Sequence, residues 1–243
     1  MAKSTGRTVL ITGGAGFIGS NLAERLLAVP GTRVRIFDNL SRAGVEHNLR
    51  WLRSLSGGDQ LEVVTGDVRD ARAVQRAAYD ASAIYHLAAQ VAVTSSVSDP
   101  AHDFDVNARG TFNVLEAARR SDHSPFILLT STNKVYGSLS RLPVEVRGSH
   151  YAAAVSDFHG VNESEPLDFH SPYGCSKGAA DQYVRDYARI YNLPTVVFRM
   201  SCIAGPRQFG NEDQGWVAHF LYSVLSGRPI TIYGDGYQVR DIL

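Results

Sequence analysis

A glycine-rich run near the N-terminus constrains the fold of this chain most strongly. The run reads GGAGFIG from Gly13 to Gly19 and follows the apolar, β-rich segment TVLIT, residues 8–12. Apolar residues at helical spacing come directly after it over 17–28, and Pro30-Gly31 ends that pattern. A strand, a glycine turn and a helix in this order predict a βα unit that can receive a phosphate group at the helix N-terminus.

The same alternation of apolar strands and helices continues along the chain. Further strands are expected over residues 33–37, 61–65, 83–87, 126–131 and 195–199, and helices over 71–78, 103–120 and 176–191. This pattern predicts a parallel sheet covered on both faces, the doubly wound α/β class of the Rossmann type. We expect residues 1–204 to form this domain, with an irregular insert over 138–171 near the active site. Residues 205–243 are expected to begin an incomplete, truncated substrate-binding domain.

Charge and composition argue against several classes of partner. Lys+Arg and Asp+Glu each number 24, so the net charge is zero. This balance disfavours binding to nucleic acid or an anionic membrane by electrostatic attraction. The N-terminus lacks the apolar stretch of a signal peptide, and no apolar run approaches the roughly 20 residues that cross a bilayer. Cys175 and Cys202 form neither a disulfide framework nor a metal cluster. We therefore expect a cytoplasmic protein that binds no metal, nucleic acid or membrane.

Asp38 indicates which dinucleotide the glycine loop would hold. It ends the second strand about 20 residues beyond the loop, where a carboxylate accepts hydrogen bonds from the adenosine ribose hydroxyls. A 2′-phosphate would be repelled there, so NAD is preferred over NADP. Arg42 lies close enough in sequence to weaken this preference without reversing it. The alternative interpretation is a glycine-rich turn that binds no ligand.

Tyr173 and Lys177 form the pattern YGCSK, which places two side chains on one face of a helix. A free tyrosine has a pKa of about 10, and a neighbouring cation favours the phenolate. Tyr173 is therefore a candidate general base. An ordinary pair of surface residues is the alternative interpretation.

These motifs together resemble the extended short-chain dehydrogenase/reductases of the NAD-dependent epimerase/dehydratase family, which act on nucleotide sugars. The resemblance rests on the glycine loop, Asp38, STNKVYG, YGCSK and Arg199 with Gly205-Pro206-Arg207, and it spans essentially the whole chain. It implies that Thr132, Tyr173 and Lys177 are catalytic, with Thr132, or else Ser131, bonding the reacting sugar hydroxyl. The cofactor-binding residues that it implies are Gly13, Gly16, Phe17, Ile18, Gly19, Asp38, Asn39, Asp67, Val68, Leu87, Ala88, Ala89, Gln90, Asn107, Tyr173, Lys177 and Ser201.

Finer features within the family are similar to the CDP-tyvelose (CDP-paratose) 2-epimerases. They are Asn133-Lys134 and the segments 167–183 and 207–217. Sugar-nucleotide 4,6-dehydratases carry an Asp-Glu pair directly after the threonine, because eliminating water needs a proton donor and a base. Asn133 and Lys134 cannot reproduce that pair, so dehydration is disfavoured.

The resemblance implies C2 epimerisation of CDP-paratose to CDP-tyvelose by transient oxidation to a keto sugar. A nucleotide sugar, preferably a CDP-sugar, is the expected substrate, and Asn133, Lys134 and Arg207 are its expected binding residues. We hypothesise that Asn133 and Lys134 hold the ring so that C2 rather than C4 faces the nicotinamide. A UDP-hexose 4-epimerase type of activity is the alternative.

Relatives continue beyond the point where this sequence ends, at Leu243. A second alternative is therefore an NAD-binding remnant that is catalytically poor because the C-terminal substrate region is missing. Extended family members commonly dimerise through the long helices after the fourth and fifth strands, so the resemblance also implies a homodimer.

Overall fold

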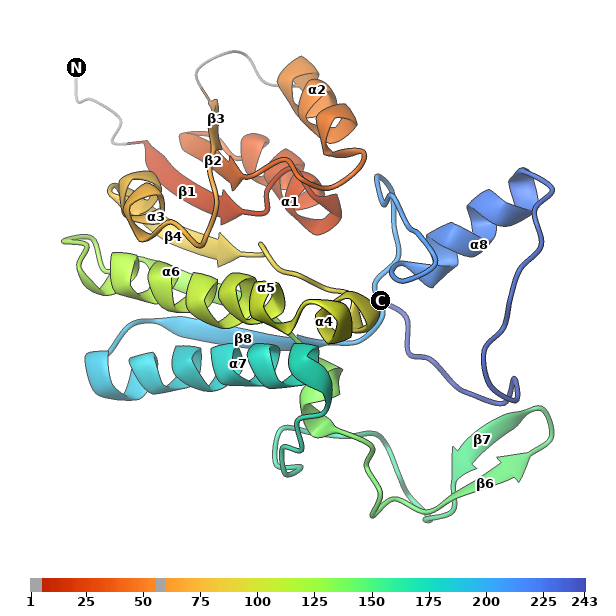
Figure 1. Ribbon diagram of the computed structural model, residues 1–243. Coiled ribbons are helices and arrows are strands. Elements are labelled where there is room, and N and C mark those ends of the chain that lie inside the picture. The colour runs from red at the N-terminus through yellow and green to blue at the C-terminus, as the bar shows by residue number, and fades with distance from the viewer. Residues whose placement is uncertain (1–5, 56–59) are drawn as a thin grey trace.

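A six-stranded sheet forms the centre of the computed structural model, which describes residues 6–55 and 60–243. Its strands lie in the order β3-β2-β1-β4-β5-β8, and every neighbouring pair is parallel (Figure 1). The chain order reverses between β1 and β4, and ligands of doubly wound sheets bind beside such a point, at the carboxyl ends of the strands. The strands are β1 (Arg7–Thr12), β2 (Thr32–Asp38), β3 (Leu61–Thr65), β4 (Ala81–His86), β5 (Phe126–Thr132) and β8 (Thr195–Met200).

Successive side chains of the central strand serve two cores, one on each face of the sheet. Val9 and Ile11 pack with the residues of α1 (Phe17–Leu27) and α2 (Val45–Leu55), whereas Leu10 packs on the opposite side. The second core contains residues of α3 (Ala71–Ala78), α6 (Gly110–Arg119) and α7 (Ser171–Tyr191). Helices thus cover both faces, as the sequence predicts.

Helix α7 is longer than the sequence predicts. It begins at Ser171 rather than at residue 176, with Pro172 in its first turn. Proline suits that position because its missing N–H has no partner inside the helix and its φ is already helical. The earlier start places Tyr173 inside the helix, two positions from its beginning.

The connection from β4 to β5 is broken into several helical pieces. It contains α4 (Val93–Ser98) and α5 (Pro100–Phe104), and a π-helical turn, Asp105–Arg109, then leads into α6. The sequence predicts one regular helix over 103–120, so the π turn is a difference. Such turns occur preferentially at functional sites, and this one carries Asn107.

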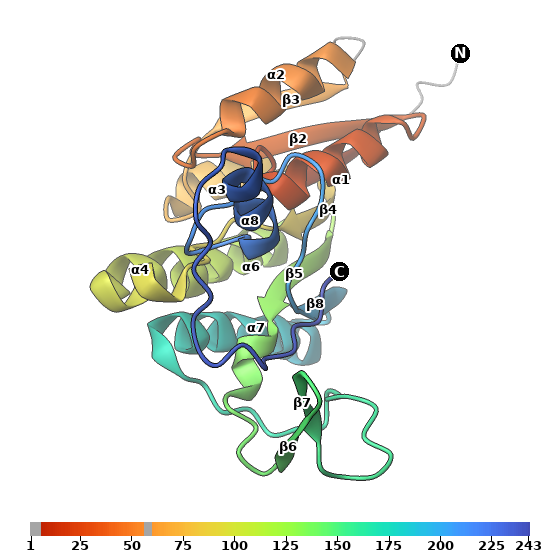
Figure 2. The same cartoon turned by 90° about the vertical axis from the view of Figure 1, so that its right-hand side faces the viewer.

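The insert over 138–171 is not irregular throughout, which corrects the sequence prediction. It contains an antiparallel hairpin, β6 (Val144–Arg147) and β7 (His150–Ala153), that projects away from the main sheet in both views (Figures 1 and 2). The base of the insert is closed by a hydrogen bond from the Asp168 N–H to the Val135 carbonyl oxygen, 2.9 Å long. The chain therefore leaves and rejoins the body of the molecule beside the end of β5.

Residues beyond β8 cross back toward the first helices before forming α8 (Trp216–Leu225). Near the end of the sequence, Ile242 forms one isolated parallel bridge with Cys202. Within 6–55 and 60–243, no helix is long and apolar enough to cross a membrane.

Candidate active site

The backbone of the glycine loop packs directly against the backbone that follows β4. Gly13 has a φ of +68°, and a Cβ on it would lie 2.7 Å from the Ala88 nitrogen. A Cβ on Gly19 would lie 2.4 Å from the Gly13 carbonyl oxygen. Both positions therefore exclude a side chain by contact with backbone, which is how glycines in such a loop permit tight turning and packing.

The N-terminus of α1 opens toward a cavity. Gly16 is the N-cap residue, and no side chain caps the helix. The first N–H groups of a helix have no partner inside it and attract anions. Gly16, Phe17, Ile18 and Gly19 all line the cavity, so these donors lie at its wall.

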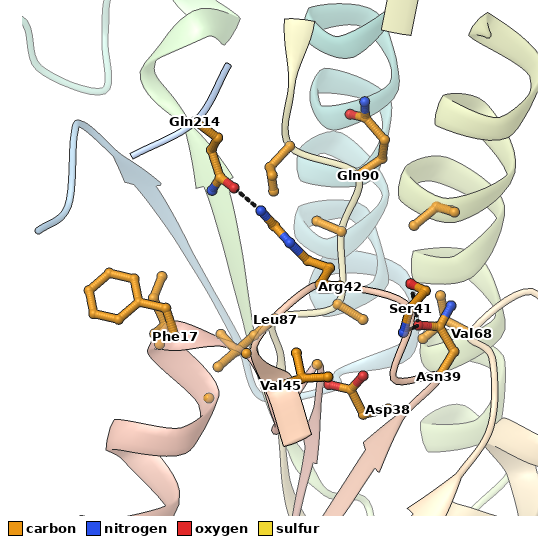
Figure 3. A pocket seen from close by; sticks show the side chains of 18 of the residues that line it. Phe17, Asp38, Asn39, Ser41, Arg42, Val45, Val68, Leu87, Gln90 and Gln214 are labelled. Carbon is orange, nitrogen blue, oxygen red and sulfur yellow. Dashed lines mark hydrogen bonds between the residues drawn. The ribbon is translucent and has the colours of Figure 1, made fainter. Parts of the chain in front are cut away.

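This cavity, of about 370 Å³, gathers most of the expected cofactor residues at the carboxyl ends of β1, β2, β3 and β4 (Figure 3). Residues that were not expected to bind the cofactor complete it, among them Ser41, Val45 and three from the distant segment after β8. The expected residues in its lining are Gly13, Gly16, Phe17, Ile18, Gly19, Asp38, Asn39, Asp67, Val68, Leu87, Ala88, Ala89 and Gln90.

Asp38 braces the glycine loop. One carboxylate oxygen accepts a hydrogen bond from the Ala15 N–H at 3.0 Å, and the other accepts from the Leu40 N–H at 2.9 Å. Burial raises the pKa of Asp38, while these two backbone hydrogen bonds act in the opposite direction. Asp38 thus joins the loop to the end of β2, and its expected bond to a ribose stays a prediction.

Asp67 and Asn39 lie together at the neighbouring strand ends. The Asn39 amide donates to Asp67 at 3.0 Å. The hydrogen bond from Arg69 holds the pKa of Asp67 well below its usual value. Asp67 is therefore a carboxylate near neutral pH.

Thr132 and Tyr173 meet where β5 ends. The Thr132 hydroxyl accepts a hydrogen bond from the Lys134 N–H at 3.2 Å and so begins the short 3₁₀ turn Asn133–Tyr136. Tyr173 is 8% exposed. Burial raises the pKa of Tyr173, and a hydrogen bond with Thr132 partly opposes that effect. The two side chains that the sequence assigned to one site are thus in contact.

Lys177 lies buried behind this pair. Its ammonium donates to the Thr130 carbonyl oxygen at 2.6 Å, and burial lowers its pKa to about 8. Asp181 and Asp103 oppose that shift by favouring the charged form. The sequence predicts that this cation lowers the pKa of Tyr173. In the structure burial raises that pKa and the negative charge of Asp103 raises it further, while the Lys177 ammonium is directed at a backbone carbonyl.

Asn107 clamps the β4 end to α7. Its side-chain oxygen accepts from the Gln90 N–H at 3.0 Å, and its amide donates to the Gln90 carbonyl oxygen at 3.0 Å. The amide also lies 3.1 Å from both the Ser176 hydroxyl and the fully buried Asp103 carboxylate. Asn107 therefore positions the segment that passes beside the cavity.

Some expected residues lie outside the cavity lining. Asn133 and Lys134 are exposed at the end of β5. The Ser201 hydroxyl donates to the Asp241 carbonyl oxygen, and the Arg207 guanidinium lies over the Trp51 ring. The cofactor role of Ser201 and the substrate roles of the other three stay predictions.

Comparison with known proteins identifies the family. The model of the NAD-dependent epimerase/dehydratase family matches residues 9–243. The chain belongs to this family. Its cofactor is accordingly NAD, and the resemblance inferred from the motifs is confirmed.

Individual relatives agree with this assignment. CDP-paratose 2-epimerase of Salmonella typhi is 48% identical over 242 residues, which cover 97% of this chain and 70% of that protein. The solved UDP-glucose 4-epimerase of Thermus thermophilus in complex with NAD matches with a TM-score of 0.78 at 34% identity, covering 97% of this chain and 70% of that one. UDP-N-acetylglucosamine 4-epimerase of Methanobrevibacter ruminantium matches with a TM-score of 0.81 at 27% identity, covering 98% and 68%.

The cavity of this family member fits NAD on structural grounds. The uncapped α1 N-terminus supplies free N–H groups for a pyrophosphate, and a side chain on Gly13 or Gly19 would collide with the backbone that shapes the loop. Asp38 presents a buried carboxylate at the end of β2. The described residues contain no group of three or more His, Cys, Asp and Glu that could hold a metal ion.

Proposed function

We propose that this protein interconverts CDP-paratose and CDP-tyvelose by inverting C2 of the sugar. The observation that carries the proposal is the contact between Thr132 and buried Tyr173, with Asn133 and Lys134 exposed directly after Thr132. A threonine–tyrosine pair without an Asp-Glu pair supports oxidation and reduction rather than loss of water. The 48% identical relative named CDP-paratose 2-epimerase supports the choice of substrate.

The residues divide the work of a reversible oxidation. Tyr173 takes the proton from the C2 hydroxyl, and Thr132 holds that oxygen by a hydrogen bond. Lys177, fixed by Thr130, supplies a positive charge behind the phenol. NAD would be held by the glycine loop and Asp38, and when bound it would supply the acceptor and later the donor of the C2 hydride. The keto sugar then rotates so that its other face receives the hydride, and Tyr173 returns the proton to the oxygen. The reaction as a whole is therefore redox-neutral.

Incubation of the purified protein with CDP-paratose tests the proposal. Proton NMR should show inversion at C2, and a reaction run in D₂O should place no deuterium on C2, because the hydrogen travels as hydride and not as a solvent proton. Inversion of UDP-glucose at C4 with no reaction of CDP-paratose would favour the alternative epimerase. Bound NAD without turnover of either sugar would favour the catalytically poor remnant.

Lys134 carries the proposed positional selectivity. Lys134→Ala should lower the C2 reaction about tenfold or let C4 inversion appear, since one hydrogen bond to a charged group is worth about that factor. Arg141→Ala is the matched control, because Arg141 is an exposed cation in the insert that follows this turn. Unchanged rate and selectivity in Lys134→Ala would contradict this role.

We further propose a homodimer formed through α6 and α7. Phe112 of α6 and Tyr183 of α7 are 41% and 49% exposed and pack edge to face at 6.1 Å. Exposed aromatic pairs of this kind suit a protein interface. Light scattering of Phe112→Glu should show a monomer where the unaltered protein shows a dimer; the same mass for both would contradict the proposal.

A further inference from the structure

The segment 205–215, which we call the strap, leaves the end of β8 and lies against the helices of the opposite half of the sheet. The Asn21 amide of α1 donates to the Pro206 carbonyl oxygen at 3.0 Å. The Asn48 amide of α2 lies 3.5 Å from the Arg207 carbonyl oxygen, and the Arg207 guanidinium covers the Trp51 ring. The strap is therefore fastened to both helices that follow the glycine loop and β2.

Phe209 provides an apolar anchor for the strap. Its ring stacks on His47 with centroids 5.9 Å apart. It also occupies the space beside Gly44, where a Cβ would lie 2.3 Å from the ring. Gly44 belongs to the loop between β2 and α2, so the strap and this loop are packed without room for a side chain between them.

The tip of the strap reaches the cofactor cavity. Asn211 and Gln214 close a tight turn through two backbone hydrogen bonds of 2.8 and 3.2 Å. The Gln214 side-chain oxygen accepts a hydrogen bond from Arg42, and the two residues point toward each other across the opening of the cavity (Figure 3). Asn211, Asp213 and Gln214 line the same cavity as Asp38 and the glycine loop.

We propose that the strap is part of the NAD site and that the Arg42–Gln214 hydrogen bond latches it over the side of the cavity that carries Asp38. NAD then leaves only when the latch opens. This inference rests on the proposed function in one respect. An epimerase of that kind needs the same nicotinamide for both hydride transfers, and escape of the reduced cofactor between them would strand the keto sugar. A strap that slows escape meets that requirement.

The dissociation rate of NAD tests the latch. Protein loaded with radiolabelled NAD is chased with excess unlabelled NAD, and the retained label is followed over time. Gln214→Ala and Phe209→Ala should each speed dissociation about tenfold, the factor expected for loss of one hydrogen bond to a charged group or of a comparable packing contact. Phe158→Ala is the matched control, since Phe158 is 41% exposed and Phe209 is 42% exposed, and Phe158 lies in the insert outside the cavity.

A double substitution separates the latch from a direct contact with NAD. Gln214→Ala should add nothing to the dissociation rate once Arg42→Ala has removed its partner, because residues that act through one contact are not additive. Thermal unfolding of the NAD-free variants checks that each is folded. Dissociation within twofold of the unaltered protein for folded Gln214→Ala and Phe209→Ala would overturn the proposal.

The two proposals fail in different ways. If the unaltered protein inverts CDP-paratose while both strap variants release NAD at its own rate, the latch is wrong and the proposed function stands. If the strap variants release NAD faster but no sugar is inverted, the latch stands and the proposed function is wrong. Failure of the unaltered protein to hold NAD would overturn both.

Discussion

The Lys177 ammonium donates a hydrogen bond of 2.6 Å to the Thr130 carbonyl oxygen, two residues before Thr132. This bond ties α7 to β5 at the point where the catalytic side chains meet. It also fixes the cation behind Tyr173 without a direct bond to the phenol. Lys177 is only 4% exposed, so its charge acts through a poorly screened interior.

Tyr173→Phe removes the proposed base while keeping the ring. The rate of C2 inversion should fall about 10²- to 10⁴-fold, the usual contribution of a positioned acid or base. NAD content should fall far less than the rate, because the ring is kept and Tyr173 would supply only one of the many contacts expected to hold the cofactor. Tyr183→Phe on the same helix is the control, because Tyr183 is 49% exposed and has no proposed catalytic role. An equal loss in both variants would show that helix α7, rather than the phenol, had been damaged.

Gly13→Ala tests the close approach in the glycine loop. Gly148 offers a matched control, because its φ of +62° resembles the +68° of Gly13 but its missing Cβ would meet nothing within 4 Å. Gly148→Ala should therefore lower the free energy of unfolding only by the backbone strain, about 1–2 kcal/mol. Gly13→Ala should lower the free energy of unfolding by more, because the Cβ falls 2.7 Å from the Ala88 nitrogen. The variant should also lose NAD binding. Urea unfolding and NAD content measure the two effects. An equal loss of unfolding free energy in the two variants would show that the close approach to Ala88 does not matter.

Local signals explain what the sequence predicts well. The strand β3 and the helix α3 have the expected bounds, and the glycine loop lies between β1 and α1 as expected. Each of these elements is specified by its own apolar spacing and by the glycines beside it. Helix α2 carried such a signal too, since Val45, Leu49 and Leu52 are its buried face, yet it was not predicted.

Contacts between distant segments explain what the sequence could not predict. Arg42 and Gln214 are 172 positions apart, and neither belongs to a periodic pattern that points to the other. The Lys177 ammonium donates to the Thr130 carbonyl, a backbone group that every residue possesses. The pKa of Tyr173 is raised mainly by burial, which the YGCSK motif does not encode. Residue spacing locates such side chains on one helix face but does not give their hydrogen-bond partners.

The Arg199–Asp181 ion pair supports the site from behind. Two hydrogen bonds of 2.9 Å join the side chains, which are 10% and 0% exposed, and Arg199 also donates to the Tyr136 hydroxyl at 2.9 Å. Arg199→Met should lower the free energy of unfolding by about 3–5 kcal/mol, because it removes the guanidinium that is hydrogen-bonded to a fully buried carboxylate. Arg119→Met breaks an exposed pair with Glu116 and should have a much smaller effect. Similar losses for the two variants in urea unfolding would show that burial does not decide the outcome.

His86 should make the stability of the protein depend on pH in a defined window. It is 1% exposed, its ring nitrogens lie 2.7 Å from the Thr12 hydroxyl and 3.0 Å from the Thr111 hydroxyl, and burial with the nearby Lys177 charge lowers its pKa to about 3. An unfolded histidine has a pKa of about 6.5, so the unfolded chain binds the extra proton between these values. The contribution to stability is therefore complete above pH 6.5 and is lost as the pH falls.

Between pH 7 and pH 5 this one group should lower the free energy of unfolding by about 2 kcal/mol. Urea unfolding at the two pH values measures the loss, and His86→Gln should reduce it because glutamine does not titrate. The control is His123→Gln, whose histidine is exposed and which should keep the full loss. If His86→Gln lost as much stability on acidification as the unaltered protein, the proton would be binding elsewhere.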